Sequence, residues 1–186
     1  MISHEIRELR IADILALHKF YDSLPEQDKC FFHPGFVGFE SINLIWILAQ
    51  FAMAASTLPI KKLILRFCPF AFVPVIMSID PSGKITGFAF TKFKIAPLEM
   101  MSIAEIGICV DARWQGKRIG TKLIERLLEL AKRSNLQMVC LSVLAENTRA
   151  IRLYEKNGFI RTRTVQKFDV WRGKRLDSIE MCLRLD

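Results

Sequence analysis

The spacing of apolar positions in the first half of the chain predicts a strand, a helix and a hairpin. Residues 4–10 alternate as a short strand does, and apolar positions then recur at helical spacing from Ile11 to Leu24. Residues 75–79 and 84–93 are rich in β-branched and aromatic side chains and flank an Asp-Pro-Ser-Gly turn, which is typical of a β-hairpin. This part of the chain is therefore expected to contain both helix and sheet.

The second half of the chain has clearer patterns of helix and strand. Ile119, Leu123 and Leu127 fall on one face of a predicted amphipathic helix, with charged residues opposite. Asn157 and Gly158 are expected to end a shorter helix, because both residue types tolerate the left-handed conformation common at helix C-termini. The elements expected here are a strand at 103–110, a helix at 119–133, a strand at 137–143, a helix at 147–156, and strands at 159–168 and 177–185. Since no repeat, linker or low-complexity segment interrupts the pattern, residues 1–186 are expected to form a single domain.

Two segments of the first half follow neither pattern clearly. Residues 27–38 are aromatic-rich and contain Pro and Gly, so we expect a loop that either walls a substrate site or is pinned to the core by its phenylalanines. Residues 42–58 are mostly apolar, but the run is shorter than the roughly 20 residues that a membrane span needs. It also contains Asn43 and Gln50. A buried or interfacial helix is predicted, and no membrane partner is expected.

The net excess of positive charge is confined to one part of the chain. The formal net charge is +8, residues 1–110 sum to zero, and residues 111–186 hold the whole excess. A local excess of this kind indicates either an anion site or a solvated basic face. No RNA- or DNA-binding motif accompanies the basic residues, so nucleic acid is not an expected partner.

The five cysteines have no C-x-x-C spacing and no nearby histidine that would complete a zinc site. Disulfides and bound metal are therefore not expected. Cys109, Cys140 and Cys182 lie in apolar, strand-like runs, where free thiols behave as small buried hydrophobes. With no basic and apolar leader at the N-terminus, this cysteine usage favours a reducing cytoplasm.

A basic, glycine-containing turn connects the strand at 103–110 to the helix that begins at Ile119. The first turn of a helix has N–H groups without intrahelical partners and a partial positive charge, so it suits a phosphate. Arg113, Lys117 and Arg118 lie beside that positive end, at a cost of a few tenths to about 1 kcal/mol each. Their presence indicates that an anion binds there, unless water and salt merely screen them.

Two motifs resemble one known family. The first is the Q-x-x-x-x-G turn from Gln115 to Gly120, and the second is N-x-x-A-I-x-L-Y-E-K-x-G-F over residues 147–159. Together they resemble the GNAT superfamily of acyl-CoA-dependent N-acetyltransferases, although Arg118 stands where the family usually has a glycine. The resemblance implies an α/β (α+β) GNAT fold, with a mixed central sheet of about seven strands flanked by about four helices. Residues 42–58 would form the second helix.

The resemblance also implies a cofactor and its binding residues. Acetyl-CoA would serve as co-substrate, with no metal. Backbone groups near Ile108 and Val110 would pair with the pantetheine arm, the segment after them would bind the diphosphate, and Asn147 and Tyr154 would flank the arm and thioester. Asn147 is equally suited to cap its helix, and Tyr154 to pack in the core. The cofactor-binding residues expected are Ile108, Val110, Gln115, Gly116, Lys117, Arg118, Ile119, Gly120, Thr121, Asn147 and Tyr154.

Acetyl transfer to an amine needs a neutral nucleophile, and an alkylamine is only about one part in a thousand neutral at pH 7. Glu105 is the candidate base, because it places a carboxylate inside an otherwise apolar strand. The alternative is a carboxylate that pairs with a basic side chain. By resemblance, Tyr154 would protonate the departing thiolate, and a backbone N–H near Cys109 or Val110 would stabilise the oxyanion.

The function predicted is therefore an N-acetyltransferase that moves an acetyl group from acetyl-CoA to a primary amine by direct attack in a ternary complex. The acceptor is expected to be a small molecule, namely an amino sugar, an amino acid or a polyamine. A protein N-terminus or lysine is the alternative acceptor. A non-catalytic acyl-CoA-binding protein and a basic nucleic-acid-binding module are alternatives of another class. The protein is expected to be a monomer or a homodimer.

Overall fold

The computed structural model describes residues 4–25, 75–93, 103–169 and 174–185. Within them lies one seven-stranded sheet in the order β1-β2-β3-β4-β5-β7-β6. Its elements are β1 (Glu5–Glu8), η1 (Ile11–Asp13), α1 (Ile14–Asp22), β2 (Ile76–Ile79), β3 (Ile85–Phe93), β4 (Ile103–Val110), η2 (Ala112–Trp114), α5 (Ile119–Arg133), β5 (Met138–Leu144), α6 (Thr148–Lys156), β6 (Ile160–Asp169) and β7 (Lys174–Arg184). All neighbouring strands are antiparallel except β4 and β5, which are parallel. The predicted mixed sheet of seven strands is confirmed.

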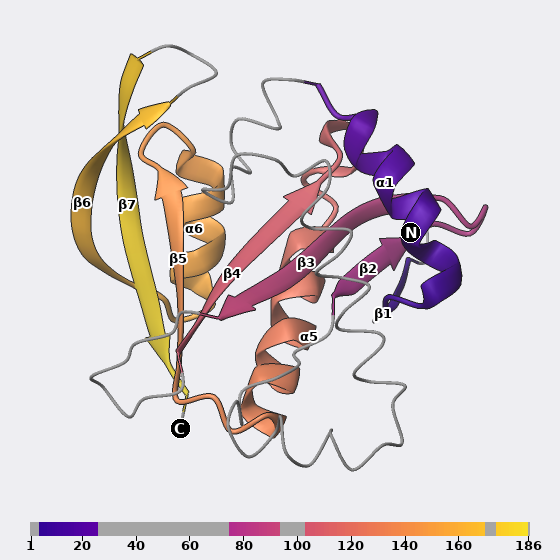
Figure 1. Cartoon of the computed structure of the whole chain (residues 1–186), viewed down its shortest axis with the longest axis horizontal. Coiled ribbons are helices and arrows are strands. Elements are labelled where there is room, and N and C mark those ends of the chain that lie inside the picture. The colour runs from indigo at the N-terminus through magenta and orange to yellow at the C-terminus, as the bar shows by residue number, and fades with distance from the viewer. Residues whose placement is uncertain (1–3, 26–74, 94–102, 170–173, 186) are drawn as a thin grey trace.

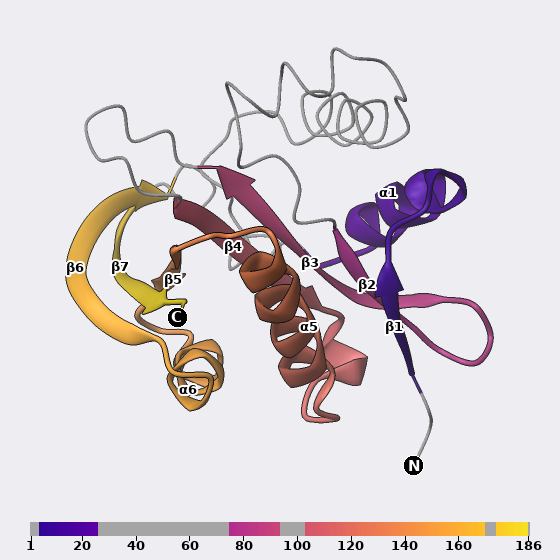
Figure 2. The ribbon, with the colours of Figure 1, turned by 90° about the horizontal axis from the view of Figure 1, so that it is seen from below.

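Helices cover both faces of this sheet. Figure 2 shows α5 and α6 on one face and α1 on the other. The core against α5 contains Leu123, Ile124 and Leu127, which are fully buried, as the amphipathic pattern predicts. A second cluster packs α1 onto β2 and β3. The sheet is therefore sandwiched between two apolar layers, and its central strands are held on both sides.

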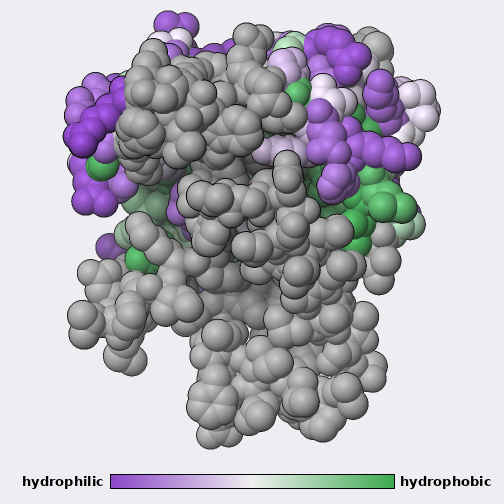
Figure 3. Space-filling model, turned by 45° about the horizontal axis from the view of Figure 1, so that its top comes forward, coloured by the Kyte–Doolittle hydropathy of each residue, from purple (hydrophilic) through white to green (hydrophobic). Residues whose placement is uncertain are grey.

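Hydrophilic side chains gather at two places on the face seen in Figure 3. Figure 3 shows hydrophilic side chains at the β6–β7 side of the molecule and around α1. Among the described residues, the large hydrophobic side chains that are exposed are Leu15 (75%) and Ile160 (67%). They lie on α1 and β6 and do not form a patch. No helix in the described part is long and apolar enough to cross a membrane.

The sheet opens between β4 and β5. The two strands pair through only three residue pairs, of which Glu105 and Cys140 are the last. Beyond that point they diverge, as Figure 1 shows. The Cys109 carbonyl points toward β3, where a Cβ at Gly87 would come 2.8 Å from it. The Val110 carbonyl points the other way and accepts a hydrogen bond from the Gln115 side chain. Backbone groups alternate in direction along a strand, so the N–H and C=O groups of Ile108 and Val110 point toward the opening.

The cysteines correct one expectation. Cys109 is a buried cysteine outside any disulfide of the described residues, as predicted, but Cys140 and Cys182 form a disulfide. Antiparallel pairing of β5 with β7 places these two residues directly opposite each other, with their Cα atoms 4.1 Å apart. The pairing joins positions 42 residues apart, so nothing in the local sequence indicates it.

We expect the double variant Cys140→Ser/Cys182→Ser to lose about 2–4 kcal/mol of unfolding free energy without reductant, because a cross-link of this loop length restricts the unfolded chain. Urea unfolding measures the loss. In excess dithiothreitol the variant and the native chain should unfold at the same urea concentration. Equal stability of the two proteins without reductant would contradict the disulfide.

Other expectations differ from the structure in smaller ways. The last strand begins at Lys174, three residues before the predicted 177. The predicted loop at 27–38, the helix at 42–58 and most of the turn before Lys174 lie outside the described residues. The described residues contain three α-helices, where the resemblance implied about four over the whole chain.

Candidate active site

A cavity of about 630 Å³ occupies the opening between β4 and β5. Its walls come from β4, the turn after it, the start of α5, β5 and α6. The predicted site residues that line it are Glu105, Ile108, Val110, Gln115, Gly116, Arg118, Ile119, Gly120, Thr121, Asn147 and Tyr154. The fold thus brings together two motifs that are separated in sequence by the whole of α5 and β5.

The three cations of the basic turn do not all face the cavity, which differs from the expectation. The Asp111 carboxylate accepts hydrogen bonds from the Arg113 backbone N–H (2.9 Å) and from its Nε (3.0 Å). These bonds hold the pKa of Asp111 below its ordinary value. The Lys117 Nζ lies 4.1 Å from the centre of the Trp114 ring, a cation–π contact. Of the three cations expected around an anion, only Arg118 lines the cavity.

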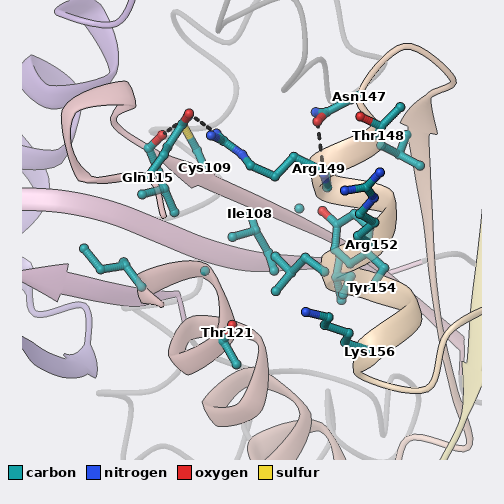
Figure 4. A pocket seen from close by; sticks show the side chains of 18 of the residues that line it. Ile108, Cys109, Gln115, Thr121, Asn147, Thr148, Arg149, Arg152, Tyr154 and Lys156 are labelled. Atoms are coloured by element: carbon teal, nitrogen blue, oxygen red, sulfur yellow. Dashed lines mark hydrogen bonds between the residues drawn. The ribbon is translucent and has the colours of Figure 1, made fainter. Parts of the chain in front are cut away.

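Gln115 connects the turn to both sides of the opening. Its Nε2 donates to the Val110 carbonyl (2.8 Å), and its Oε1 accepts from the Arg149 guanidinium. Figure 4 shows the Arg149 side chain extending from α6 across the cavity to this amide. The amide therefore fixes the end of β4 to the turn and contacts α6 across the opening.

The turn places helix N–H groups at the cavity. Gly116 and Arg118 both have positive φ, 78° and 63°, so the chain turns sharply just before α5 begins. Ile119, Gly120 and Thr121 form the first turn of α5 and line the cavity. Because the N–H groups of a first turn lack intrahelical partners, this wall can bind a phosphate.

Arg118 adopts a backbone conformation that favours glycine, at a cost of about 1 kcal/mol for an L-residue with a side chain. We therefore expect Arg118→Gly to raise the free energy of unfolding by up to about that amount. Arg118→Ala is the control, because it removes the guanidinium and keeps the strained backbone. Urea unfolding of the two variants checks this; an equal change in both would contradict the assignment of strain.

Helix α6 supplies the facing wall. The Asn147 Oδ1 accepts from the Ala150 N–H (3.1 Å), so Asn147 caps the helix and also lines the cavity. Tyr154 is 7% exposed, packs its ring against Phe159 and also lines the cavity. Burial, together with the nearby Cys109 thiol, raises the pKa of the Tyr154 phenol above its ordinary value. The hydroxyl therefore stays protonated at neutral pH and is available as a proton donor.

Glu105 lies at the other end of the cavity. Its neighbours Ala104 and Ile106 are in the core against α5, so Glu105 points to the opposite face of the sheet. There it is half-buried, beside Phe90 and Ser142 in the cavity wall. A Cβ at Gly107 would come within 2.4 Å of the Phe90 ring, so glycine makes room for that ring. The cavity thus passes through the sheet, from the helix N-terminus on one face to a carboxylate on the other.

Sequence reasoning missed part of the wall formed by α6. Arg149, Arg152 and Lys156 line the cavity, and their spacing places them on one side of the helix. That spacing is visible in the sequence, but the sequence does not show that this side of the helix faces the cavity. Phe90 and Ser142 were missed as well, because their strands meet the cavity only in the folded sheet.

Comparison with known proteins gives curated relatives of similar sequence. The chain is 30% identical over 120 residues to the L-methionine sulfoximine/L-methionine sulfone acetyltransferase of Salmonella typhimurium, which covers 61% of this chain and 66% of that protein. It is 30% identical over 80 residues to the L-amino acid N-acetyltransferase AaaT of Escherichia coli, covering 42% and 49%. The match to the ribosomal protein bS18-alanine N-acetyltransferase of Escherichia coli is 29% over 105 residues, covering 56% and 68%. The chain thus spans less than two thirds of the length of the first two relatives.

Solved structures share the fold. The structure of yncA from Salmonella typhimurium with its cofactor acetyl-CoA aligns with a TM-score of 0.73 at 23% identity, covering 99% of this chain and 95% of that one. A ribosomal-protein-alanine N-acetyltransferase from Brucella melitensis aligns with a TM-score of 0.71 at 20% identity, covering 97% and 99%. Residues 50–159, more than half of the chain, match the profile of the acetyltransferase (GNAT) family. This protein therefore belongs to the GNAT family of acetyltransferases.

Proposed function

We propose that this protein transfers an acetyl group from acetyl-CoA directly to a primary amine. The observation that carries the proposal is the cavity through the sheet, which joins a phosphate-binding helix N-terminus on one face to Glu105 on the other. A long acyl thioester fits such a passage, because its phosphates and its reactive end are far apart. The amine then approaches from the Glu105 face.

The walls of the opening fit the coenzyme. The first turn of α5 and Arg118 would hold the diphosphate. Ile108 and the N–H of Val110 would pair with the pantetheine amides as an added strand, since β4 lacks a β5 partner there. Acetyl-CoA supplies the acetyl group as a thioester, which an amine can attack without a protein nucleophile. Cys109 therefore needs no covalent role.

The residues at the reacting end have complementary tasks. Glu105 takes a proton from the ammonium of the acceptor, directly or through water, so that nitrogen can form the new C–N bond. A backbone N–H of β4 beside the thioester, other than the one that pairs with the pantetheine arm, donates to the carbonyl oxygen as negative charge develops there. The nitrogen of the tetrahedral intermediate releases its second proton to solvent. Tyr154 gives its proton to the sulfur as the C–S bond breaks, and solvent then reprotonates Tyr154 and deprotonates Glu105. The products are an amide and coenzyme A.

The acceptor we propose is a small molecule, and amino acids stand first. Two relatives named above are acetyltransferases of amino acids or of methionine derivatives. A protein N-terminus is the second candidate, because another relative is named for the alanine of a ribosomal protein.

A thiol-release assay tests this function. Purified protein is incubated with acetyl-CoA and, separately, with amino acids, amino sugars, polyamines and short peptides that begin with alanine. Amine-dependent release of free thiol, with an acetylated amine found by mass spectrometry, is the expected result. Acetyl-CoA binding without release across the panel would overturn catalysis and leave a non-catalytic acyl-CoA-binding protein.

A further inference from the structure

Two cations on α6 form a group that the reaction above does not use. Arg152 and Lys156 are exposed, lie one helical turn apart and line the cavity. Figure 4 shows both on the part of α6 that borders the cavity. Residues at this spacing are neighbours on a helix surface, so the two positive groups share one site.

Neither cation is neutralised within the described part of the chain, where no hydrogen bond or ion pair joins the side chain of Arg152 or Lys156 to another residue. Glu155 lies between them in sequence, but its carboxylate pairs with Arg161 of β6 (2.7 Å). Arg163 of β6 is likewise paired, with Glu180. The two α6 cations therefore repel each other across one turn, and a bound anion would relieve that repulsion.

The pair lies next to the phosphate-binding wall. A Cβ at Gly120 would come 3.1 Å from Leu153 Cδ2, so α6 closely approaches the first turn of α5 at this level. Leu153 directly follows Arg152. The N–H groups of α5 and the side-chain cations of α6 therefore line the same cavity, and both cations lie within one helical turn of the point where the two helices approach each other.

We propose that Arg152 and Lys156 bind the phosphate monoester on the ribose of coenzyme A. The proposal rests on the function proposed above and adds a recognition step to it. Coenzyme A carries a diphosphate and, on the ribose attached to it, a separate 3′-phosphate. A phosphate monoester has a charge of about −1.5 to −2 near pH 7, which two cations match. The first turn of α5 then takes the diphosphate, while the side-chain pair selects coenzymes that carry the extra phosphate.

The experiment compares coenzyme A with its 3′-dephospho form. Dissociation constants for both are measured by calorimetry on the native chain, on Arg152→Gln/Lys156→Gln, and on the matched control Lys132→Gln/Arg133→Gln. The control removes two cations from the last turn of α5, outside the cavity lining. Thermal melts of all three proteins verify that they fold.

The native chain should bind coenzyme A about 10- to 100-fold more tightly than the dephospho form, the range expected for charge-assisted hydrogen bonds. In the α6 variant this ratio should fall to within about threefold, because only coenzyme A loses affinity. The control should keep the native ratio.

Two results would overturn the assignment while leaving the proposed function intact. One is equal binding of the two coenzymes by the native chain. The other is an equal loss for both coenzymes in the α6 variant, which would place the pair on the diphosphate. If the native chain binds neither coenzyme, the proposed function fails together with this inference.

Discussion

Tyr154→Phe should lower turnover by about 100-fold or more, while the affinity for acetyl-CoA changes by less than about twofold. The hydroxyl is the only group removed, and a positioned general acid typically contributes a factor of about 10²–10⁴. The phenyl ring that remains still packs against Phe159, so the wall of the cavity is preserved. Steady-state kinetics and direct titration with acetyl-CoA separate the two effects.

The pH profile gives a second test of Tyr154. Because burial raises the pKa of this phenol, the acid form persists at pH values near 10, where an ordinary phenol ionises. The native enzyme should therefore show no loss of turnover from Tyr154 ionisation near pH 10. Tyr21→Phe on α1 removes the only other tyrosine of the chain and should leave turnover unchanged. Unaltered turnover in Tyr154→Phe would remove Tyr154 from the acid role.

Glu105→Gln should lower kcat/KM for alkylamine acceptors by about 100-fold at neutral pH. The glutamine keeps the shape of the side chain but cannot accept the proton that about 999 of every 1000 alkylamine molecules carry. Loss of a general base costs a factor of about 10²–10⁴. The measurement is the initial rate at saturating acetyl-CoA over a range of acceptor concentrations.

Two controls sharpen the test of Glu105. Glu146→Gln neutralises the other carboxylate residue that lines the cavity, just before α6, and should change kcat/KM by less than about threefold. An aromatic amine that is already neutral at pH 7 should be acetylated by Glu105→Gln with little loss. If alkylamines are acetylated at native rates by Glu105→Gln, deprotonation does not depend on this carboxylate.

The basic half of the chain divides into cations with different surroundings. Arg118, Arg149, Arg152 and Lys156 line the cavity. By contrast, Arg113 binds Asp111, and the β6 arginines Arg161 and Arg163 pair with Glu155 and Glu180. Part of the excess charge is thus held in ion pairs, and the rest is available to a polyanion.

The local sequence determined the limits of a helix or strand wherever the apolar residues kept the helical or the alternating period over its whole length. The strand at 103–110 and the helix at 119–133 have the predicted limits, because apolar residues fix the buried face of each. Asn147 caps α6 as its residue type predicts, and Gly158 has the positive φ of a helix end. These features depend on neighbours within a few positions, so the sequence alone contains them.

Only the tertiary structure decided what depends on pairing between distant strands. The separation of β4 from β5 after Glu105 creates the cavity, and the pairing of β5 with β7 joins Cys140 to Cys182. The same folding brings the cations of α6 and the start of α5 to one cavity. Strand order and register are set by the packing of the whole sheet, and no local period encodes them. The sequence therefore determined which groups are present, and the fold determined which of them meet.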